Sequence, residues 1–183
     1  VELSSASPRG GGLGGSSALA VTLIAAAIRL RDGRQPLATE LVHLARDLEA
    51  RLMGLPTGIQ DHYPAILGGA LAIEARPGTE GVSPLEVDLE GLSRSLVVAY
   101  TGSSHFSAGA NWTIVRRRFE ADPEIFSLLG AISETAQELR ARLEEGDLEA
   151  VGALMGRDWS YRRRLSPAIP TAEIEALLAA AQR

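Results

Sequence analysis

The stretch PRGGGLGGSSALAVTL, from Pro8 to Leu23, places five glycines and two serines directly before an apolar, helix-like run. Ordering glycine costs more conformational entropy than ordering any other residue, so the cluster indicates a close approach to the backbone. A glycine loop entering a helix can present several N–H groups to an anion, and the helix N-terminus adds partial positive charge. This favours a nucleotide triphosphate as ligand. The alternative is a tight strand-to-helix turn in which glycine only relieves crowding.

Composition limits the classes of function. The chain has 183 residues, 45% hydrophobic and 22% charged, which is typical of one globular domain or two small ones. Cysteine is absent, which excludes disulfides and thiolate metal sites. All 18 basic residues are arginine, so neither a Walker A lysine nor a Schiff-base amine is present. The net charge of −5 disfavours a general nucleic-acid binder.

Membrane crossing is also disfavoured by the sequence. The longest apolar run, Ala18 to Ile28, is too short to span a bilayer. We therefore expect a cytoplasmic protein without nucleic acid or membrane among its partners. The oligomeric state stays open, and a dimer is possible.

Hydrophobic periodicity predicts a mixed α and β first half and a mostly helical second half, with a boundary near Leu92. Capping residues and apolar spacing predict helices over residues 16–30, 36–53 and 123–145, and from residues 107, 147 and 171 onward. The helix over 16–30 is apolar all round and is therefore expected to be buried. Strands are predicted over residues 1–7, 70–75, 85–89 and 95–101, with an irregular stretch over 54–69 and a polar loop over 76–84.

Two acids follow the glycine loop at useful positions. Phosphoryl transfer depends on positioning and electrostatics, with one carboxylate near the attacking hydroxyl and another on the metal. Glu49 near the end of its helix opposes the helix dipole, a cost of roughly 0.3–1 kcal/mol, which hints at a use such as binding a cation. Asp61 lies in a glycine-rich segment that can deliver it into a cleft. The alternatives are a solvated helix-end glutamate and an aspartate that caps a helix or forms a turn.

The segment from Pro8 to Ala18 resembles the second signature of the GHMP kinases, the superfamily of galactokinase, homoserine kinase and mevalonate kinase. That pattern runs proline, a few small residues, Gly-Leu-Gly and then Ser-Ser-Ala. The extra Gly15 is similar to the variant in sugar kinases, especially heptose-phosphate kinases. The resemblance implies that ATP phosphates are held by the loop, with Ser17 beside Mg²⁺; the phosphate-binding candidates are Gly11, Gly12, Leu13, Gly14, Gly15, Ser16 and Ser17.

The segment GLPTGIQDHYPAILGG, from Gly54 to Gly69, looks like the GHMP stretch that carries the catalytic aspartate. Its form is Gly-x-Pro-small-Gly-apolar-x-Asp, the spacing of galactokinase, and mevalonate kinase has one residue less. The resemblance implies Asp61 as general base or hydroxyl-orienting carboxylate. It also implies Glu49 with Ser17 on Mg²⁺, and it makes Gly58 and Gln60 substrate-side candidates.

Two later segments resemble heptose-kinase-like members. AYTGSSHFSAGANWTIVRRR begins at Ala99 and offers Thr101 and His105 as substrate contacts, although His105 is equally an ordinary surface-loop histidine. DWSYRRRLSPAIPT begins at Asp158, and its three arginines either approach a substrate phosphate or face solvent. The implied substrate is a sugar or sugar phosphate, with a heptose phosphate favoured over galactose-like sugars and mevalonate-pathway alcohols.

The resemblance implies the α+β GHMP kinase fold. Residues 1–92 would belong to a ribosomal S5 domain 2-like α/β domain that binds ATP, and residues 93–183 to a mostly helical, ferredoxin-like C-terminal domain, both incomplete. The first signature and the glycine-rich third loop of the family are outside these 183 residues. Two hypotheses follow: an ATP-dependent kinase with Mg²⁺, or a catalytically incompetent fragment or binding module of the same shape.

Overall fold

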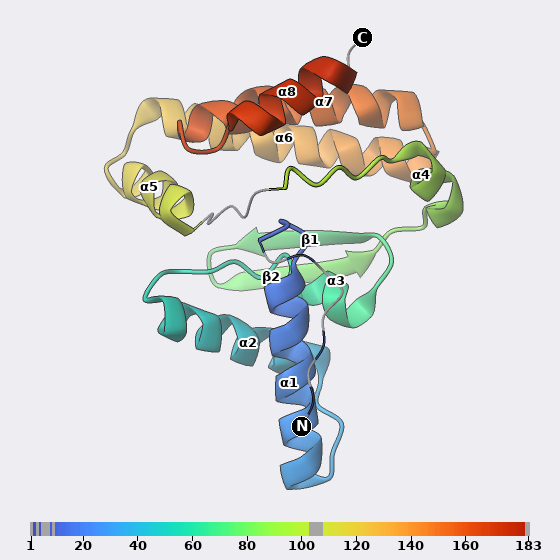
Figure 1. Ribbon diagram of the computed structural model, residues 1–183, viewed down its shortest axis with the longest axis vertical. Coiled ribbons are helices and arrows are strands. Elements are labelled where there is room, and N and C mark those ends of the chain that lie inside the picture. The colour runs from blue at the N-terminus through green and yellow to red at the C-terminus, as the bar shows by residue number, and fades with distance from the viewer. Residues whose placement is uncertain (1, 3, 5–7, 9, 103–107, 182–183) are drawn as a thin grey trace. The chain divides into compact units, whose positions relative to one another are not determined.

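The computed structural model describes residues 2, 4, 8, 10–102 and 108–181 (Figure 1). The predicted strand over residues 1–7 lies largely outside them. The chain forms two compact units, one reaching Leu85 and the other beginning at Glu86. Together the described residues are mostly helical with one two-stranded sheet, an α+β composition. None of the described helices combines the length and apolar character that crossing a bilayer requires.

The first unit begins with two long helices and one short one. These are α1 (Gly15–Asp32), α2 (Ala38–Met53) and α3 (His62–Leu67). The prediction of α1 and α2 is confirmed to within two residues at each end. The short α3 falls inside the segment predicted to be irregular, so that prediction is wrong over six residues. A six-residue helix is too short for hydrophobic periodicity to reveal.

Helix α1 packs against both α2 and α3, and α2 also packs against α3. Val21 and Ile28 are the buried apolar residues of α1, whereas Leu30 is exposed. The expectation of burial all round is therefore wrong, because its packing partners cover one side. On α2 the buried apolar residues are Leu41, Val42 and Ala45. The spacing of the leucines predicted this helix, but only one of these buried residues is a leucine.

A β-hairpin completes the first unit. Strands β1 (Leu71–Arg76) and β2 (Thr79–Pro84) pair antiparallel, and Arg76 faces Thr79 across a Pro77-Gly78 turn. Gly78 has φ of 78°, a value that favours glycine. The predicted strand over 70–75 is confirmed, but the predicted loop over 76–84 is wrong. The two-residue turn with glycine was the available hairpin signal.

The second unit is helical in its described residues. It contains α4 (Leu89–Ser95), α5 (Ala108–Phe119), α6 (Pro123–Glu145), α7 (Leu148–Leu165) and α8 (Ala172–Ala181). The predicted strands over 85–89 and 95–101 are wrong. Asp88 instead caps α4 by accepting a hydrogen bond from the Gly91 N–H at 3.0 Å. The described residues 96–100 belong to neither strand of the sheet.

The helices after residue 107 form as predicted. Asp122 and Asp147 cap α6 and α7 by accepting backbone hydrogen bonds, and Pro123 occupies the first turn of α6. A core of Ile125, Leu128 and Leu165 joins α6 to the end of α7. The ferredoxin-like arrangement and the domain boundary near Leu92 stay predictions.

Candidate active site

The glycine loop has the backbone conformation that only glycine adopts readily. Gly10, Gly12 and Gly14 have φ values of 68°, 70° and 66°. A Cβ placed on Gly12 would meet no atom within 4 Å. At Gly12, glycine is therefore required by the left-handed backbone conformation and not by close neighbouring atoms. This disfavours the alternative in which the glycines of the loop only relieve crowding.

The loop ends at the N-terminus of α1 with free backbone donors. Gly14 is the N-cap residue and supplies no side-chain cap, and the first turn carries no acid. The Ala18 N–H makes the first helical hydrogen bond, to the Gly14 carbonyl at 2.9 Å. The amides of Gly15, Ser16 and Ser17 precede that bond and have no backbone acceptor among the described residues, although Ser17 itself is buried. The Gly11 N–H, in contrast, donates to the Pro8 carbonyl at 3.2 Å.

Asp61 lies directly against this loop. A Cβ on Gly14 would stand 3.2 Å from the Asp61 Cβ and 3.5 Å from its Cγ. Asp61 occupies the N-cap position of α3, but its side chain makes no capping hydrogen bond among the described residues. The side chain is exposed. Its carboxylate is therefore not used by the helix that it precedes.

The loop and Asp61 line one cavity. It has a volume of about 280 Å³ and is lined by Leu13, Gly14, Ala18, Asp61, Pro64 and Ala65. All of these residues belong to the first unit. Two motifs separated in sequence thus meet at one concave surface, with a helix N-terminus on one side and a carboxylate on the other.

Glu49 is partly buried and lies against a histidine. Its Oε2 lies 3.1 Å from Nε2 of His62, and the two side chains are 18% and 1% exposed. This distance is within ion-pair range, but neither ring nitrogen of His62 has a hydrogen-bond partner in the described structure. The two atoms are therefore close without the alignment of a hydrogen bond.

No preformed metal cage accompanies these acids. Within the described ranges, no three His, Asp or Glu side chains are grouped closely enough to hold a metal ion.

Tyr63 anchors α3 to the hairpin and to α2. Its hydroxyl donates to Oε1 of Glu80 at 2.6 Å, and Nε2 of His43 lies 2.6 Å from the same oxygen. Burial and then the Glu80 contact raise the pKa of Tyr63 to about 12. The hydrogen bond from Tyr63 in turn lowers the pKa of the Glu80 carboxyl. Of the two residues directly after Asp61, His62 thus lies against Glu49 of α2, and Tyr63 is hydrogen-bonded to Glu80 of β2.

Sequence reasoning missed His62, Tyr63 and Glu80. The adjacent polar aromatic pair after Asp61 was the available signal for the first two. Glu80 fell in a predicted loop, and nothing in the local pattern linked it to Tyr63.

The other predicted site residues are distributed differently. Ser17 is buried in α1. The Gln60 side chain folds over Gly58, where a Cβ would come within 2.0 Å of its Oε1. Thr101 belongs to the second unit, and His105 lies outside the described residues. Arg162, Arg163 and Arg164 form ion pairs with Asp158, Glu175 and Glu124 respectively.

Comparison with known proteins identifies the family. Residues 1–69 match the model of the GHMP kinases N terminal domain. The chain is 34% identical over 161 residues to mevalonate kinase of Thermococcus onnurineus, covering 86% of this chain and 44% of that protein. It is 25% identical over 173 residues to D-glycero-alpha-D-manno-heptose 7-phosphate kinase of Campylobacter jejuni, covering 92% and 50%.

A third relative is the bifunctional fucokinase/GDP-fucose pyrophosphorylase of Arabidopsis thaliana. It is 27% identical over 166 residues, which cover 87% of this chain and 16% of that protein. The chain therefore spans half or less of the length of these relatives. The glycine loop and the Asp61 segment both lie within residues 1–69, the part of the chain that belongs to the family of GHMP kinases N terminal domains.

Proposed function

We propose that this chain carries the nucleotide-binding and acceptor-orienting groups of an ATP-dependent small-molecule kinase. The observation that carries the proposal is that Gly14 and Asp61 line the same cavity. Backbone donors at a helix start suit a polyphosphate, and a carboxylate beside them suits the acceptor hydroxyl. In this proposal residues 1–92 form the ATP-binding domain, residues 93–183 the C-terminal domain, and the activity is cytoplasmic.

The loop is fitted to the phosphates of ATP by its backbone. The left-handed glycines at Gly12 and Gly14 turn the chain, and the first-turn amides of α1 that follow have no backbone acceptor among the described residues. The amides of Gly12, Leu13, Gly14, Gly15, Ser16 and Ser17 are the donors in this assignment. The Gly11 amide is engaged with Pro8 and acts by shaping the turn.

Ser17 and Glu49 are the residues that we assign to Mg²⁺. The ion would neutralise charge that develops on the transferred phosphoryl group. Both side chains are largely withdrawn from solvent, which strengthens their interaction with a cation. Their small number agrees with a metal whose remaining ligands are phosphate oxygens and water.

Asp61 is assigned to the acceptor alcohol. Its carboxylate orients the hydroxyl and accepts its proton as the new P–O bond forms and ADP leaves. Its exposed position and the lack of a capping hydrogen bond among the described residues support this role, because the carboxylate is not occupied by the start of α3.

We propose a sugar phosphate, specifically a heptose phosphate, as the acceptor. The heptose-kinase-like sequence features at Gln60 and Thr101 and the sugar-kinase relatives support this choice; the substrate-side residues are Gly58, Gln60, Thr101 and His105. The second candidate is a mevalonate-type alcohol, which the mevalonate kinases among the relatives favour.

A binding experiment tests the nucleotide site. Unfolding of the chain is followed with ATP and Mg²⁺, with ATP alone and with AMP and Mg²⁺. A ligand at 100 times its dissociation constant adds about 2.7 kcal/mol to the free energy of unfolding. We expect the full increase only with ATP and Mg²⁺. An unchanged stability would contradict the proposal and favour a binding module without nucleotide.

A second experiment tests the acceptor. Transfer of the labelled γ-phosphate is measured for a heptose phosphate, galactose and mevalonate. We expect transfer to the heptose phosphate, and transfer to mevalonate alone would select the second candidate.

A further inference from the structure

His62 is a polar side chain that is buried without hydrogen bonds among the described residues to explain its burial. It is 1% exposed and among the largest fully buried side chains of the described structure. Neither Nδ1 nor Nε2 has a hydrogen-bond partner among the described residues. Leaving a buried polar group unsatisfied costs about 1–3 kcal/mol, so an apolar residue of similar size would be the more stable occupant. Such an exception in a native protein calls for an explanation.

The position of His62 joins two predicted site carboxylates. It follows Asp61 directly in the chain, and its Nε2 lies 3.1 Å from Oε2 of Glu49 on α2. Asp61 in turn lies against Gly14. One dipeptide thus connects the glycine loop, the acceptor-side acid and the acid assigned to the metal.

We propose that His62 is a positioning residue that restricts the orientation of the Glu49 carboxylate, the group assigned to Mg²⁺. The inference rests on the proposed function. A carboxylate opposite Nε2 favours the tautomer that carries its proton on Nε2, since a carboxylate can only accept. The 3.1 Å between Nε2 and Oε2 is within hydrogen-bond distance, so an Nε2–H aligned with Oε2 would form an N–H···O hydrogen bond. Partners that orient metal-binding side chains in this way have large effects on metal affinity.

The chain offers a matched control for this pair. His43 also presents Nε2 to a glutamate, Glu80, at 2.6 Å, and like Glu49 it belongs to α2. Its side chain is about half exposed, whereas that of His62 is buried. Neither pair lines the cavity itself, but His62 directly follows Asp61, which does. Loss of the His43 contact therefore tests the general effect of removing a histidine–glutamate pair from this unit.

The test measures Mn²⁺ as a probe for Mg²⁺, by electron paramagnetic resonance of the full chain with ADP. His62→Leu is expected to weaken Mn²⁺ binding 10- to 100-fold. His62→Gln is expected to restore most of the affinity, because its side-chain amide also offers an N–H donor. His43→Leu is expected to leave the affinity unchanged. Wild-type affinity in His62→Leu, or equal losses in His62→Leu and His62→Gln, would overturn the inference.

A nuclear magnetic resonance measurement keeps the inference testable if His62→Leu does not fold. Long-range ¹H–¹⁵N spectra of the folded protein are expected to show the Nε2-protonated tautomer for His62. Glu49→Gln should shift the His62 signals and leave those of His43 in place. An Nδ1-protonated His62, or His62 signals that ignore Glu49→Gln, would overturn the inference.

Failure of the proposed function gives a different result. A wild-type chain that binds neither ADP nor Mn²⁺ with ADP contradicts the nucleotide site itself, and the role of His62 falls with it. A wild-type chain that binds both, with unchanged affinity in His62→Leu, contradicts the role of His62 alone.

Discussion

Gly14 and Asp61 stand so close that a side chain on the glycine would press on the acid. The nearest approach is 3.2 Å, between an added Cβ and the Asp61 Cβ. Contacts this short require the neighbour to give way, and here the neighbour is the residue assigned to the acceptor hydroxyl. The glycine therefore has two reasons to be there, its left-handed φ of 66° and the position of Asp61.

Gly14→Ala should lower both stability and nucleotide binding. A non-glycine residue in the left-handed region costs roughly 1–2 kcal/mol, and displacement of Asp61 adds a loss at the site. Gly33→Ala is the matched control, because Gly33 caps the other end of α1 with φ of 68° and has open space around its Cβ position. Denaturant unfolding and ATP titration measure the two effects. Equal ATP affinity in both variants would show that the contact has no role in binding.

Asp61→Ala should abolish phosphoryl transfer and leave the fold intact. Loss of a general base commonly costs 10²–10⁴ in rate. Because the Asp61 side chain is exposed and makes no capping bond in the described structure, the free energy of unfolding should change by about 0.5 kcal/mol or less. Turnover and thermal unfolding of the full protein measure both quantities.

Asp88→Ala is the control for the loss of an N-cap aspartate. Its side chain accepts the Gly91 N–H, so its removal should cost about 1 kcal/mol without lowering kcat. Near-normal turnover of Asp61→Ala would remove Asp61 from the mechanism.

The long helices were predictable because their signals are local. The positions Gly33, Gly54 and Asp122 end or begin helices through backbone conformation or capping that neighbouring residues determine. The strand predictions over 85–89 and 95–101 failed because apolar alternation does not reveal whether a partner strand is present. At Asp88, the local capping interaction prevailed over that alternation.

The site was predictable only as far as the resemblance to the GHMP kinase motifs extended. That resemblance pointed to Gly14 and Asp61, and in the structure both line one cavity. The burial of His62 and Tyr63 depends on partners from other elements, Glu49 and Glu80, which no local pattern identifies. The roles of these side chains stay predictions that the measurements described here decide.

The stability of the first unit should depend on pH through Glu80. The Tyr63 hydrogen bond lowers the pKa of Glu80 in the folded state below its ordinary value of 4.5. Because its pKa is lower in the folded state, ionised Glu80 adds to the free energy of unfolding above pH 4.5. This contribution is lost as the pH falls through the pKa of Glu80 in the folded state.

Glu80→Gln should therefore be less stable than wild type at pH 7, and this difference should shrink toward pH 3. Urea unfolding at both pH values measures it. Glu74→Gln on the neighbouring strand β1 is the control, since that side chain is 56% exposed. A destabilisation by Glu80→Gln that is equal at both pH values would contradict the assigned coupling.

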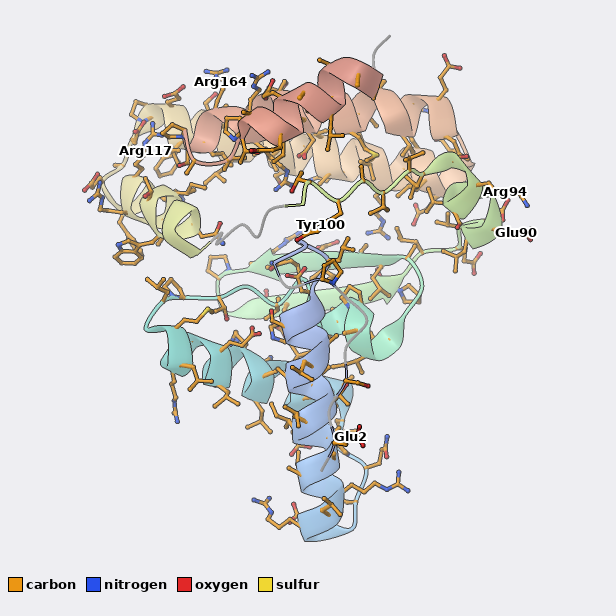
Figure 2. All side chains as sticks on the ribbon, viewed as in Figure 1. Glu2, Glu90, Arg94, Tyr100, Arg117 and Arg164 are labelled. Atoms are coloured by element: carbon orange, nitrogen blue, oxygen red, sulfur yellow. The ribbon has the colours of Figure 1, made fainter. Side chains whose placement is uncertain are left out.

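The stability of the second unit should depend strongly on Arg117, which joins α5 to α6 and to the end of α7 (Figure 2). Its guanidinium donates to Asp122 at 2.7 Å, to the Leu165 carbonyl at 3.2 Å and to Glu124 at 3.2 Å. Its side chain is 24% exposed. The hydrogen bond from Arg117 lowers the pKa of the Asp122 carboxyl. Only a guanidinium group, with several N–H donors in one plane, can donate to these three acceptors at once.

Arg117→Ala should therefore lower the Tm of this unit more than Arg94→Ala. Arg94 makes an i,i+4 pair with Glu90 on α4, with side chains 67% and 82% exposed, and such pairs contribute about 0.3–0.5 kcal/mol. Arg117→Lys should recover little, because one ammonium cannot replace the fork. Thermal unfolding at pH 7 and pH 3 separates the cases: the excess loss in Arg117→Ala should shrink at pH 3, because the stability that comes from the lowered pKa of Asp122 declines once the pH falls below the ordinary value of 3.8. Equal Tm values for the two alanine variants would mean that the Arg117 contacts contribute no more than a surface pair.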